Sequence, residues 1–157
     1  MIALDVARRQ LDWSLRNDPR VEVIERRNAR EIEPGELPFA PALATVDVSF
    51  ISLTKILPAV GRCVTADGEI LAMVKPQFEL GPERLGKGGV VREAADRRDA
   101  LRGVAEAAQD AGLAVLGFAS SGLPGPKGNR ETFIRLRNDA VTSSGIDVEE
   151  AIEAVEP

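Results

Sequence analysis

Three charged residues in this 157-residue sequence stand at the ends of short apolar runs that have the length of buried strands. Asp5 ends the first run, Asp47 follows the run at 42–46, and Lys75 follows the run at 69–74. Ligands of an open parallel sheet bind beyond the carboxyl ends of its strands, so these side chains would share one edge. A carboxylate that holds a lysine ammonium there could let the lysine orient a substrate hydroxyl and help to deprotonate it. Taken alone, each residue is better explained as a turn, a cap or a solvated strand end, so the hypothesis rests on their coincidence.

Glu131 is a fourth candidate for the same edge. It stands where the last predicted strand begins, after a turn rich in glycine and proline. We expect that strand to be antiparallel, which places its beginning beside the carboxyl ends of the other strands. Glu131 could therefore join Asp47 and Lys75 in one catalytic site. The alternative is a surface glutamate that pairs with Arg130.

The elements that must position these residues can be read from the hydrophobic pattern. Apolar runs and alternation predict strands at residues 2–6, 21–25, 42–46, 69–74, 113–119 and 132–136. Helical periodicity and caps predict helices at residues 52–64 and 94–111, with shorter helices at 8–16 and 147–155. Strands that alternate with helices indicate an α/β fold with a mostly parallel sheet. The last two strands are joined by about a dozen residues, too few for a crossover helix, which predicts an antiparallel strand near the C-terminal end.

The composition limits the chemistry that the chain can perform. It has no histidine and one cysteine, which excludes zinc, iron–sulfur and haem sites of usual ligation, and Ser-His or Cys-His catalysis. We therefore expect no metal site, and acid or base catalysis must use Asp, Glu or Lys. No apolar run has the ~18 residues of a membrane span, and the N-terminus lacks a signal-peptide pattern. We expect a cytoplasmic protein that contacts no membrane.

The net charge of −5 argues against binding of nucleic acid through overall charge. Basic residues nevertheless occur in two glycine-containing loops, where they could contact a phosphate backbone. These residues are Lys87 and Arg92 in the first loop, and Lys127 and Arg130 in the second. The alternative for the first loop is a lid that binds no ligand.

Seven blocks of the sequence resemble the TlyA (hemolysin A type) branch of the FtsJ-like RNA ribose methyltransferases. In chain order they are Ala3-Leu-Asp-Val, Gln10-Leu, Trp13-Ser-Leu-Arg-Asn-Asp-Pro-Arg, Val46-Asp-Val-Ser-Phe-Ile-Ser-Leu, Val74-Lys-Pro-Gln-Phe-Glu, Gly86-Lys-Gly-Gly-Val-Val-Arg and Gly125-Pro-Lys-Gly-Asn-Arg-Glu. The resemblance implies a class I, Rossmann-like methyltransferase sheet. It also implies S-adenosyl-L-methionine as the methyl donor, a ribose 2'-hydroxyl of ribosomal RNA as the acceptor, and ribosomal RNA or a ribosomal subunit as the partner.

The resemblance also assigns roles to single residues. The family uses a Lys-Asp-Lys-Glu tetrad, and by motif match Asp47, Lys75 and Glu131 are its last three members. Asp5 falls where the family places an acid on the cofactor's ribose, and Asn28 falls near the position that contacts the adenine. With Asp47, these two residues form the predicted cofactor-binding set.

The sequence departs from the family in what precedes its first strand. The family's glycine-rich first motif, the first lysine of the tetrad and the small N-terminal RNA-binding domain have no counterpart in these 157 residues. We therefore predict a partial methyltransferase domain at residues 1–137 and an acidic tail at 138–157, which holds six acids and no base. The rival hypothesis is a catalytically silent remnant or interaction module that keeps the fold.

The absent first strand has a structural consequence. In the methyltransferase fold it lies at the sheet centre, between the strand that ends at Asp5 and the strand that ends at Asp47. We expect one of three outcomes: the two flanking strands pair with each other, another chain fills the gap, or the N-terminal segment to about Arg30 attaches loosely.

Overall fold

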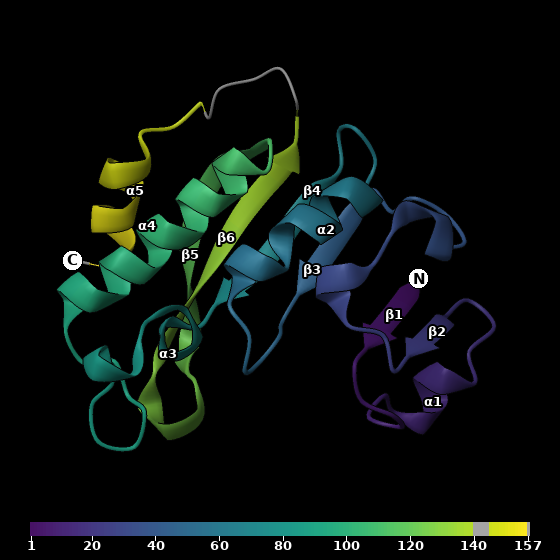
Figure 1. Ribbon diagram of the computed structural model, residues 1–157, viewed down its shortest axis with the longest axis horizontal. Helices are drawn as coiled ribbons and strands as arrows, with labels where there is room; N and C mark the ends of the chain where they lie inside the picture. The colour runs from purple at the N-terminus through teal and green to yellow at the C-terminus, as the bar shows by residue number, and fades with distance from the viewer. Residues whose placement is uncertain (140–144, 157) are drawn as a thin grey trace.

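The structure is a computed structural model that describes residues 1–139 and 145–156. Figure 1 shows a twisted sheet covered by helices, with a small N-terminal unit beside it. The sheet consists of β3 (Leu43–Val46), β4 (Glu69–Val74), β6 (Arg130–Asn138) and β5 (Leu113–Pro124), in that spatial order. β3 and β4 are parallel, whereas β6 is antiparallel to both β4 and β5. The predicted α/β fold with an antiparallel strand near the C-terminal end is confirmed.

The β5–β6 hairpin is longer than the sequence pattern predicts. We expected strands at 113–119 and 132–136, whereas the structure extends them to 113–124 and 130–138. The connection therefore has five residues instead of about a dozen. The pairing of β5 with β6 has two irregularities in its register. Such bulges bend a strand and increase its twist.

The core lies between the sheet and its helices. In β4 every second residue is buried, which is the period expected of a strand with one face against the core. Ile70 from β4 and Ile134 and Leu136 from β6 pack in one cluster with Val104 of α4 (Ala94–Asp110). The predicted helix at 94–111 is confirmed.

The predicted helix at 52–64 is divided in two. A 3-10 turn at Leu53–Lys55 comes first, and Ser52 caps it by accepting a hydrogen bond from the Thr54 amide at 3.1 Å. α2 (Leu57–Cys63) then follows. Pro58 explains the division, because proline has no N–H and cannot donate the hydrogen bond that a continuous helix would make to the Thr54 carbonyl. The other short helices are α3 (Pro76–Glu79) and 3-10 turns at Ala29–Glu31, Pro34–Glu36, Pro82–Arg84 and Pro126–Gly128.

The N-terminal unit is a separate small sheet. β1 (Ile2–Asp5) pairs in parallel with β2 (Glu22–Glu25), and neither strand pairs with β3. The predicted helix at 8–16 is reduced to α1 (Trp13–Arg16), because Arg9 has left-handed backbone with a φ of 61° and the helix begins only after its Asp12 cap.

A second apolar cluster attaches this unit to α2. It consists of Ile32, Ala59 and Cys63, with Leu4 and Leu37 packed against them. The strands that flank the predicted gap therefore do not close on each other, and the N-terminal unit is held by side chains on α2.

The acidic C-terminal segment contributes to the core. The helix predicted at 147–155 is present as α5 (Val148–Val155), capped by Asp147, which accepts a hydrogen bond from the Glu150 amide at 3.1 Å. Ile152 is fully buried in the main cluster. Residues 140–144 and 157 of the predicted tail lie outside the described residues.

Within residues 1–139 and 145–156, no helix is long and apolar enough to cross a membrane. The same residues contain no cluster of three or more acidic or cysteine side chains that could hold a metal ion.

Candidate active site at the carboxyl edge of the sheet

Asp47 and Lys75 meet at the edge where β3 and β4 end. The Lys75 Nζ lies 2.6 Å from the Asp47 Oδ1 and also donates to the Ser49 Oγ at 3.2 Å. The Lys75 side chain is only 12% exposed, whereas that of Asp47 is 67% exposed. Pro76 follows as the first residue of α3, so the backbone after Lys75 is fixed. The predicted convergence of these two charges is confirmed.

Glu131 lies on the neighbouring strand. β4 and β6 pair Val74 with Thr132, and the next position in the same antiparallel register places Lys75 opposite Glu131. Glu131 is 8% exposed, and its buried Oε1 has no hydrogen-bond partner in the described part of the chain. Among these residues the ion-pair partner of Lys75 is Asp47 and not Glu131, so Glu131 flanks the Asp47–Lys75 pair without joining it.

The turn before β6 leaves Glu131 little space. A Cβ on Gly125 would lie 2.4 Å from the Glu131 Oε1 and 2.5 Å from its Cδ. Only glycine therefore permits this carboxylate position. The alternative of an Arg130–Glu131 surface pair is not what the structure contains, because Arg130 instead approaches Glu156 at 3.9 Å.

Glu79, which sequence analysis did not single out, connects the segments that follow the two strands. Its Oε2 accepts a hydrogen bond from the Ser52 hydroxyl at 2.6 Å, and its Oε1 accepts one from the Leu53 amide at 2.9 Å. Burial raises the pKa of the Glu79 carboxyl, and the bonds from Leu53 and Ser52 oppose that rise. The carboxylate thus ties the segment after Lys75 to the segment after Asp47. The sequence feature that could have pointed to Glu79 is its position four residues after Lys75.

An exposed aromatic ring on the segment after Asp47 approaches the segment after Lys75. Phe50 is 91% exposed and has left-handed backbone with a φ of 62°, which is costly for a bulky residue. Its ring lies 5.1 Å from that of Phe78, centroid to centroid. Strained backbone of this kind collects at functional sites.

The two other predicted cofactor residues lie at the end of the small sheet. Asp5 is exposed, and its Oδ1 accepts the Ala7 amide hydrogen bond at 2.7 Å. Asn28 caps a 3-10 turn through the Arg30 amide at 3.1 Å. The Arg27 amide donates to the Asp5 carbonyl, so Asp5 and Asn28 share one edge of the unit. Each side chain therefore accepts a hydrogen bond from a nearby backbone amide, whether or not it also binds a ligand.

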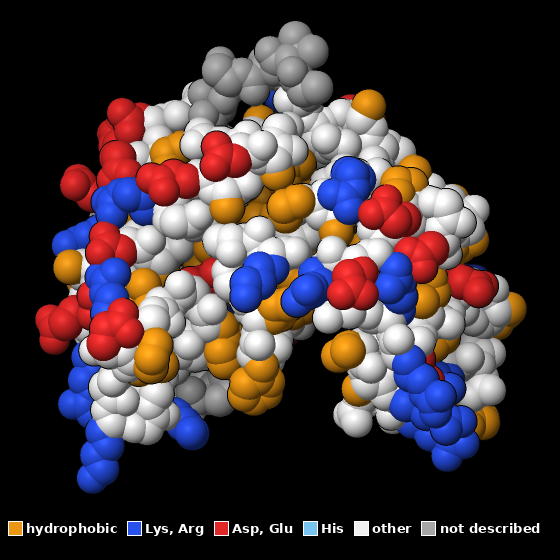
Figure 2. All heavy atoms as spheres, viewed as in Figure 1, with side chains coloured by type: hydrophobic (Ala, Val, Ile, Leu, Met, Phe, Trp, Pro, Cys, Tyr) orange, Lys and Arg blue, Asp and Glu red, His pale blue; other side chains and the backbone are white. Residues whose placement is uncertain are grey.

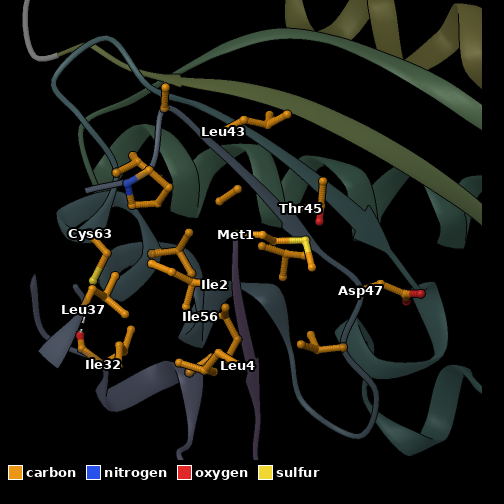
Figure 3. A pocket seen from close by; sticks show the side chains of 18 of the residues that line it. Met1, Ile2, Leu4, Ile32, Leu37, Leu43, Thr45, Asp47, Ile56 and Cys63 are labelled. Carbon is orange, nitrogen blue, oxygen red and sulfur yellow. Dashed lines mark hydrogen bonds between the residues drawn. The ribbon is translucent and has the colours of Figure 1, made fainter. Parts of the chain in front are cut away.

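A cavity of about 710 Å³ separates this unit from the main sheet. Figure 3 shows Met1, Ile2 and Leu4 of the N-terminal segment on one side and Leu43 and Thr45 of β3 on the other, with Asp47 at one end. Every residue from 41 to 48 lines it, so the cavity lies against the unpaired backbone edge of β3. Asp47 is the one predicted cofactor residue among its lining residues; Asp5 and Asn28 lie outside it.

The four predicted RNA-binding residues are all exposed. The buried Asn129 side chain joins their two loops, because its Nδ2 donates to the Gly89 carbonyl at 3.0 Å and its Oδ1 accepts the Val91 amide hydrogen bond at 2.9 Å. The loop that carries Lys87 and Arg92 is therefore held against the turn that carries Lys127 and Arg130. We call these four residues the basic rim.

A second group of arginines was not predicted from the sequence. Figure 2 shows Lys and Arg side chains gathered at the far end of the N-terminal unit. Arg8, Arg9 and Arg26 are exposed, and none forms an ion pair with another described residue. The Arg26 amide donates to the Ala7 carbonyl, so the two segments that carry these arginines are adjacent. Arg9 and Arg26 both have positive φ, at 61° and 58°.

Residues 1–138 of the chain match the sequence model of the FtsJ-like methyltransferase family. The chain belongs to this family. Within it, the chain is 44% identical over 150 residues to the 16S/23S rRNA (cytidine-2'-O)-methyltransferase TlyA of Mycobacterium tuberculosis, covering 94% of the chain and 56% of the relative. It is 36% identical over 130 residues to Hemolysin A of Brachyspira hyodysenteriae, covering 82% and 54%. The FtsJ-like chain thus spans about half the length of these curated relatives.

Solved structures agree with the family assignment. A "putative hemolysin" from Streptococcus thermophilus superposes with a TM-score of 0.91 at 37% identity, covering 98% of the FtsJ-like chain and 57% of that protein. A SAM-dependent methyltransferase of Methanosarcina mazei superposes with a TM-score of 0.53 at 13% identity, covering 88% and 81%. At that identity the second similarity shows the fold alone, and that fold is the class I methyltransferase fold predicted from the sequence.

Proposed function

We propose that the chain is the catalytic part of an S-adenosyl-L-methionine-dependent methyltransferase that modifies a ribose 2'-hydroxyl of ribosomal RNA. The observation that carries the proposal is the 2.6 Å contact between the largely buried Lys75 side chain and the exposed Asp47 carboxylate at the ligand-binding edge of the sheet. The name of the Mycobacterium tuberculosis relative indicates the same reaction on 16S and 23S rRNA. Such an enzyme works where ribosomes are made, which places it in the cytoplasm.

The site residues suit this reaction because a ribose hydroxyl is a weak nucleophile. When bound, the cofactor supplies an electrophilic methyl group. Asp47 holds the Lys75 ammonium in one position, so that Lys75 can donate to the 2'-oxygen and stabilise the charge that develops there. The Glu131 Oε1, which has no hydrogen-bond partner among the described residues, is the candidate proton acceptor. In-line positioning and proton removal are sufficient, without a covalent intermediate.

The described residues fit part of the cofactor. The exposed Asp5 carboxylate has a second oxygen that can accept hydrogen bonds from the two ribose hydroxyls, and Asp47 lies at the mouth of the cavity beside β3. The glycine-rich turn that holds the methionine part in the family has no counterpart in the sequence. We therefore assign the adenosine end of the cofactor to this chain.

RNA contacts follow from exposed groups around the same edge. The basic rim can neutralise backbone phosphates, and the exposed ring of Phe50 offers a surface on which an unstacked base can lie. Overall charge supplies no attraction, so these local contacts must account for binding.

A methyl-transfer assay tests the proposal. The 157-residue chain is incubated with ribosomal subunits and methyl-labelled S-adenosyl-L-methionine at concentrations up to millimolar. Label that appears in 2'-O-methyl nucleosides, which resist alkaline hydrolysis of the RNA, supports the proposal, provided that Lys75→Ala abolishes it. Lys55→Ala is the matched control, because Lys55 is an exposed lysine without an ion pair among the described residues.

The rival function, an interaction module without catalysis, has one observation in its favour. The chain spans 56% of the Mycobacterium tuberculosis relative, so part of the relative's machinery lies outside the matched region. RNA binding by the wild-type chain without any methyl transfer, unchanged by Lys75→Ala, would favour this rival over the enzyme.

A further inference from the structure

Arg97 of α4 and Glu156 form a buried ion pair. The Arg97 Nε lies 2.8 Å from the Glu156 Oε2, and the two side chains are 8% and 5% exposed. Removing two charges from water is costly unless their remaining donors and acceptors are also satisfied. The contacts of the pair therefore indicate what its burial achieves.

Arg97 also binds the loop of the basic rim. Its Nη1 donates to the Arg92 carbonyl at 2.7 Å and to the Val91 carbonyl at 3.4 Å. Arg98 donates to the Glu156 carbonyl at 2.9 Å, so the end of the α5 segment is fixed by backbone as well as by side chain. One guanidinium thus connects the C-terminal segment to the loop that carries Lys87 and Arg92.

Asn129 extends this connection to the second loop. Its side-chain hydrogen bonds to Gly89 and Val91 hold the turn before Glu131 against the same loop. The two rim loops and the C-terminal segment therefore form one hydrogen-bonded unit, centred on residues that are each less than 9% exposed.

The unit lies directly beside the backbone of the candidate site. Val74, Pro76 and Thr132 surround the same small space as the Arg97–Glu156 pair. Val74 and Pro76 flank Lys75, and Thr132 follows Glu131. A change in the Arg97–Glu156 pair can therefore alter the packing beside both strand ends directly.

We propose that Arg97 and Glu156 are positioning residues that fix the basic rim relative to Lys75 and Glu131. On this view α5 is part of the RNA-binding edge, and the acidic C-terminal segment acts through one buried carboxylate rather than through its overall charge. That the basic rim contacts RNA rests on the proposed function. That Arg97 and Glu156 hold the basic rim in place does not rest on it.

The test compares two double variants of the 157-residue chain. Arg97→Met with Glu156→Leu replaces the buried pair by apolar side chains, a change that folded proteins often tolerate. Arg102→Met with Glu149→Leu is the matched control, because it removes another α4–α5 ion pair, of 2.7 Å, that lies on the surface and touches neither loop. Arg97→Lys is the conservative variant, which keeps the charge but loses the guanidinium fork.

Hydrogen exchange and RNA affinity are the readouts. In the first double variant we expect the amides of residues 89–92 to exchange at least tenfold faster while those of β4 stay protected, and the Kd for a ribosomal RNA fragment to rise at least fivefold. Arg97→Lys should give intermediate values, and the control should match the wild type. A purely structural role would instead lower protection in β4 to the same extent.

Two results would overturn the inference: unchanged exchange at residues 89–92 in the first double variant, or equal acceleration in the control. If the wild-type chain binds no ribosomal RNA, the proposed function loses its support, yet the exchange comparison still decides whether the ion pair holds the loop. If the first double variant does not fold, the comparison of Arg97→Lys with the wild type decides the question by the same exchange criterion.

Discussion

The Lys75 ammonium and the Asp47 carboxylate lie 2.6 Å apart, yet Lys75 is nearly buried and Asp47 is open to solvent. This asymmetry fits a site that a substrate covers from one side, because the lysine is held in place while the carboxylate faces the incoming molecule. The lysine keeps a second partner, the Ser49 hydroxyl, at 3.2 Å. Its orientation therefore depends on both groups.

Asp47→Asn should lower methyl transfer by about a hundredfold or more, because the Lys75 ammonium loses the charge that positions it. RNA affinity should change by less than about twofold, since the basic rim is untouched. Steady-state kinetics with separate binding measurements check both statements. Glu69→Gln is the matched control: it removes the 2.7 Å Arg135–Glu69 pair at the opposite end of β4. Equal loss of activity in both variants would contradict the assignment.

Gly125→Ala should displace the Glu131 carboxylate, because the new Cβ would lie 2.4 Å from its Oε1. We expect methyl transfer to fall at least tenfold and the free energy of unfolding to fall by about 1–3 kcal/mol through overpacking. Gly103→Ala provides the control, since a Cβ there meets nothing within 4 Å and alanine stabilises a helix by about 1 kcal/mol over glycine. A Gly125→Ala variant with the full methyl transfer of the wild type would show that the position of Glu131 does not matter.

Glu79→Gln should change how stability depends on pH. Burial raises the pKa of Glu79 above its ordinary value of 4.5, so the folded chain retains a proton that the unfolded chain has lost. Its stabilising contribution is therefore complete below that ordinary value and declines as the pH rises through the folded-state pKa. The wild-type free energy of unfolding minus that of Glu79→Gln should fall as the pH rises above about 4.5.

Urea unfolding at several pH values measures this difference. Glu106→Gln, which removes a carboxyl group from an exposed position of α4, is the control with which the Glu79→Gln difference is compared. A Glu79 difference that rises with pH would mean that the carboxyl is stabilised as an anion, against the direction stated here.

Phe50→Ala should weaken binding of ribosomal RNA about fivefold or more, because base–aromatic stacking contributes about 1–3 kcal/mol per base. The salt dependence of the Kd should stay as it is in the wild type, since the ring releases no counterions. Fluorescence anisotropy at several salt concentrations gives both quantities. Unaltered affinity would remove Phe50 from the RNA-binding surface.

Replacing Arg8, Arg9 and Arg26 together by glutamine tests the second arginine group. If these arginines bind RNA phosphates, the slope of log K against log salt should fall by about 0.7–0.9 for each phosphate that is no longer neutralised. Lys55→Gln is the control, because it removes an exposed charge outside both the arginine group and the basic rim, and it should leave the slope unchanged. A triple variant with the wild-type slope would show that these arginines meet no phosphates.

The sequence by itself determined the elements whose patterns are local. Strand 69–74 and helix 94–111 are recognisable by their periods of two and 3.6 residues, and Asp47 and Lys75 were found because polar residues at strand ends are visible without coordinates. Their contact followed from the parallel order of β3 and β4. The seven sequence blocks likewise identified the family without any knowledge of distances.

Only the tertiary structure decided which distant residues support the site. Glu79 reaches Ser52 across 27 positions, Asn129 reaches Gly89 across 40, and Arg97 reaches Glu156 across 59. Such pairs leave no periodic signal, because their geometry depends on how whole elements are arranged. Here β6 enters between β4 and β5, and that placement brings the turn before Glu131 against the loop after Lys75. The meeting of Asp47 and Lys75 could therefore be predicted from residue types at strand ends, whereas long-range packing fixed the framework that holds those residues.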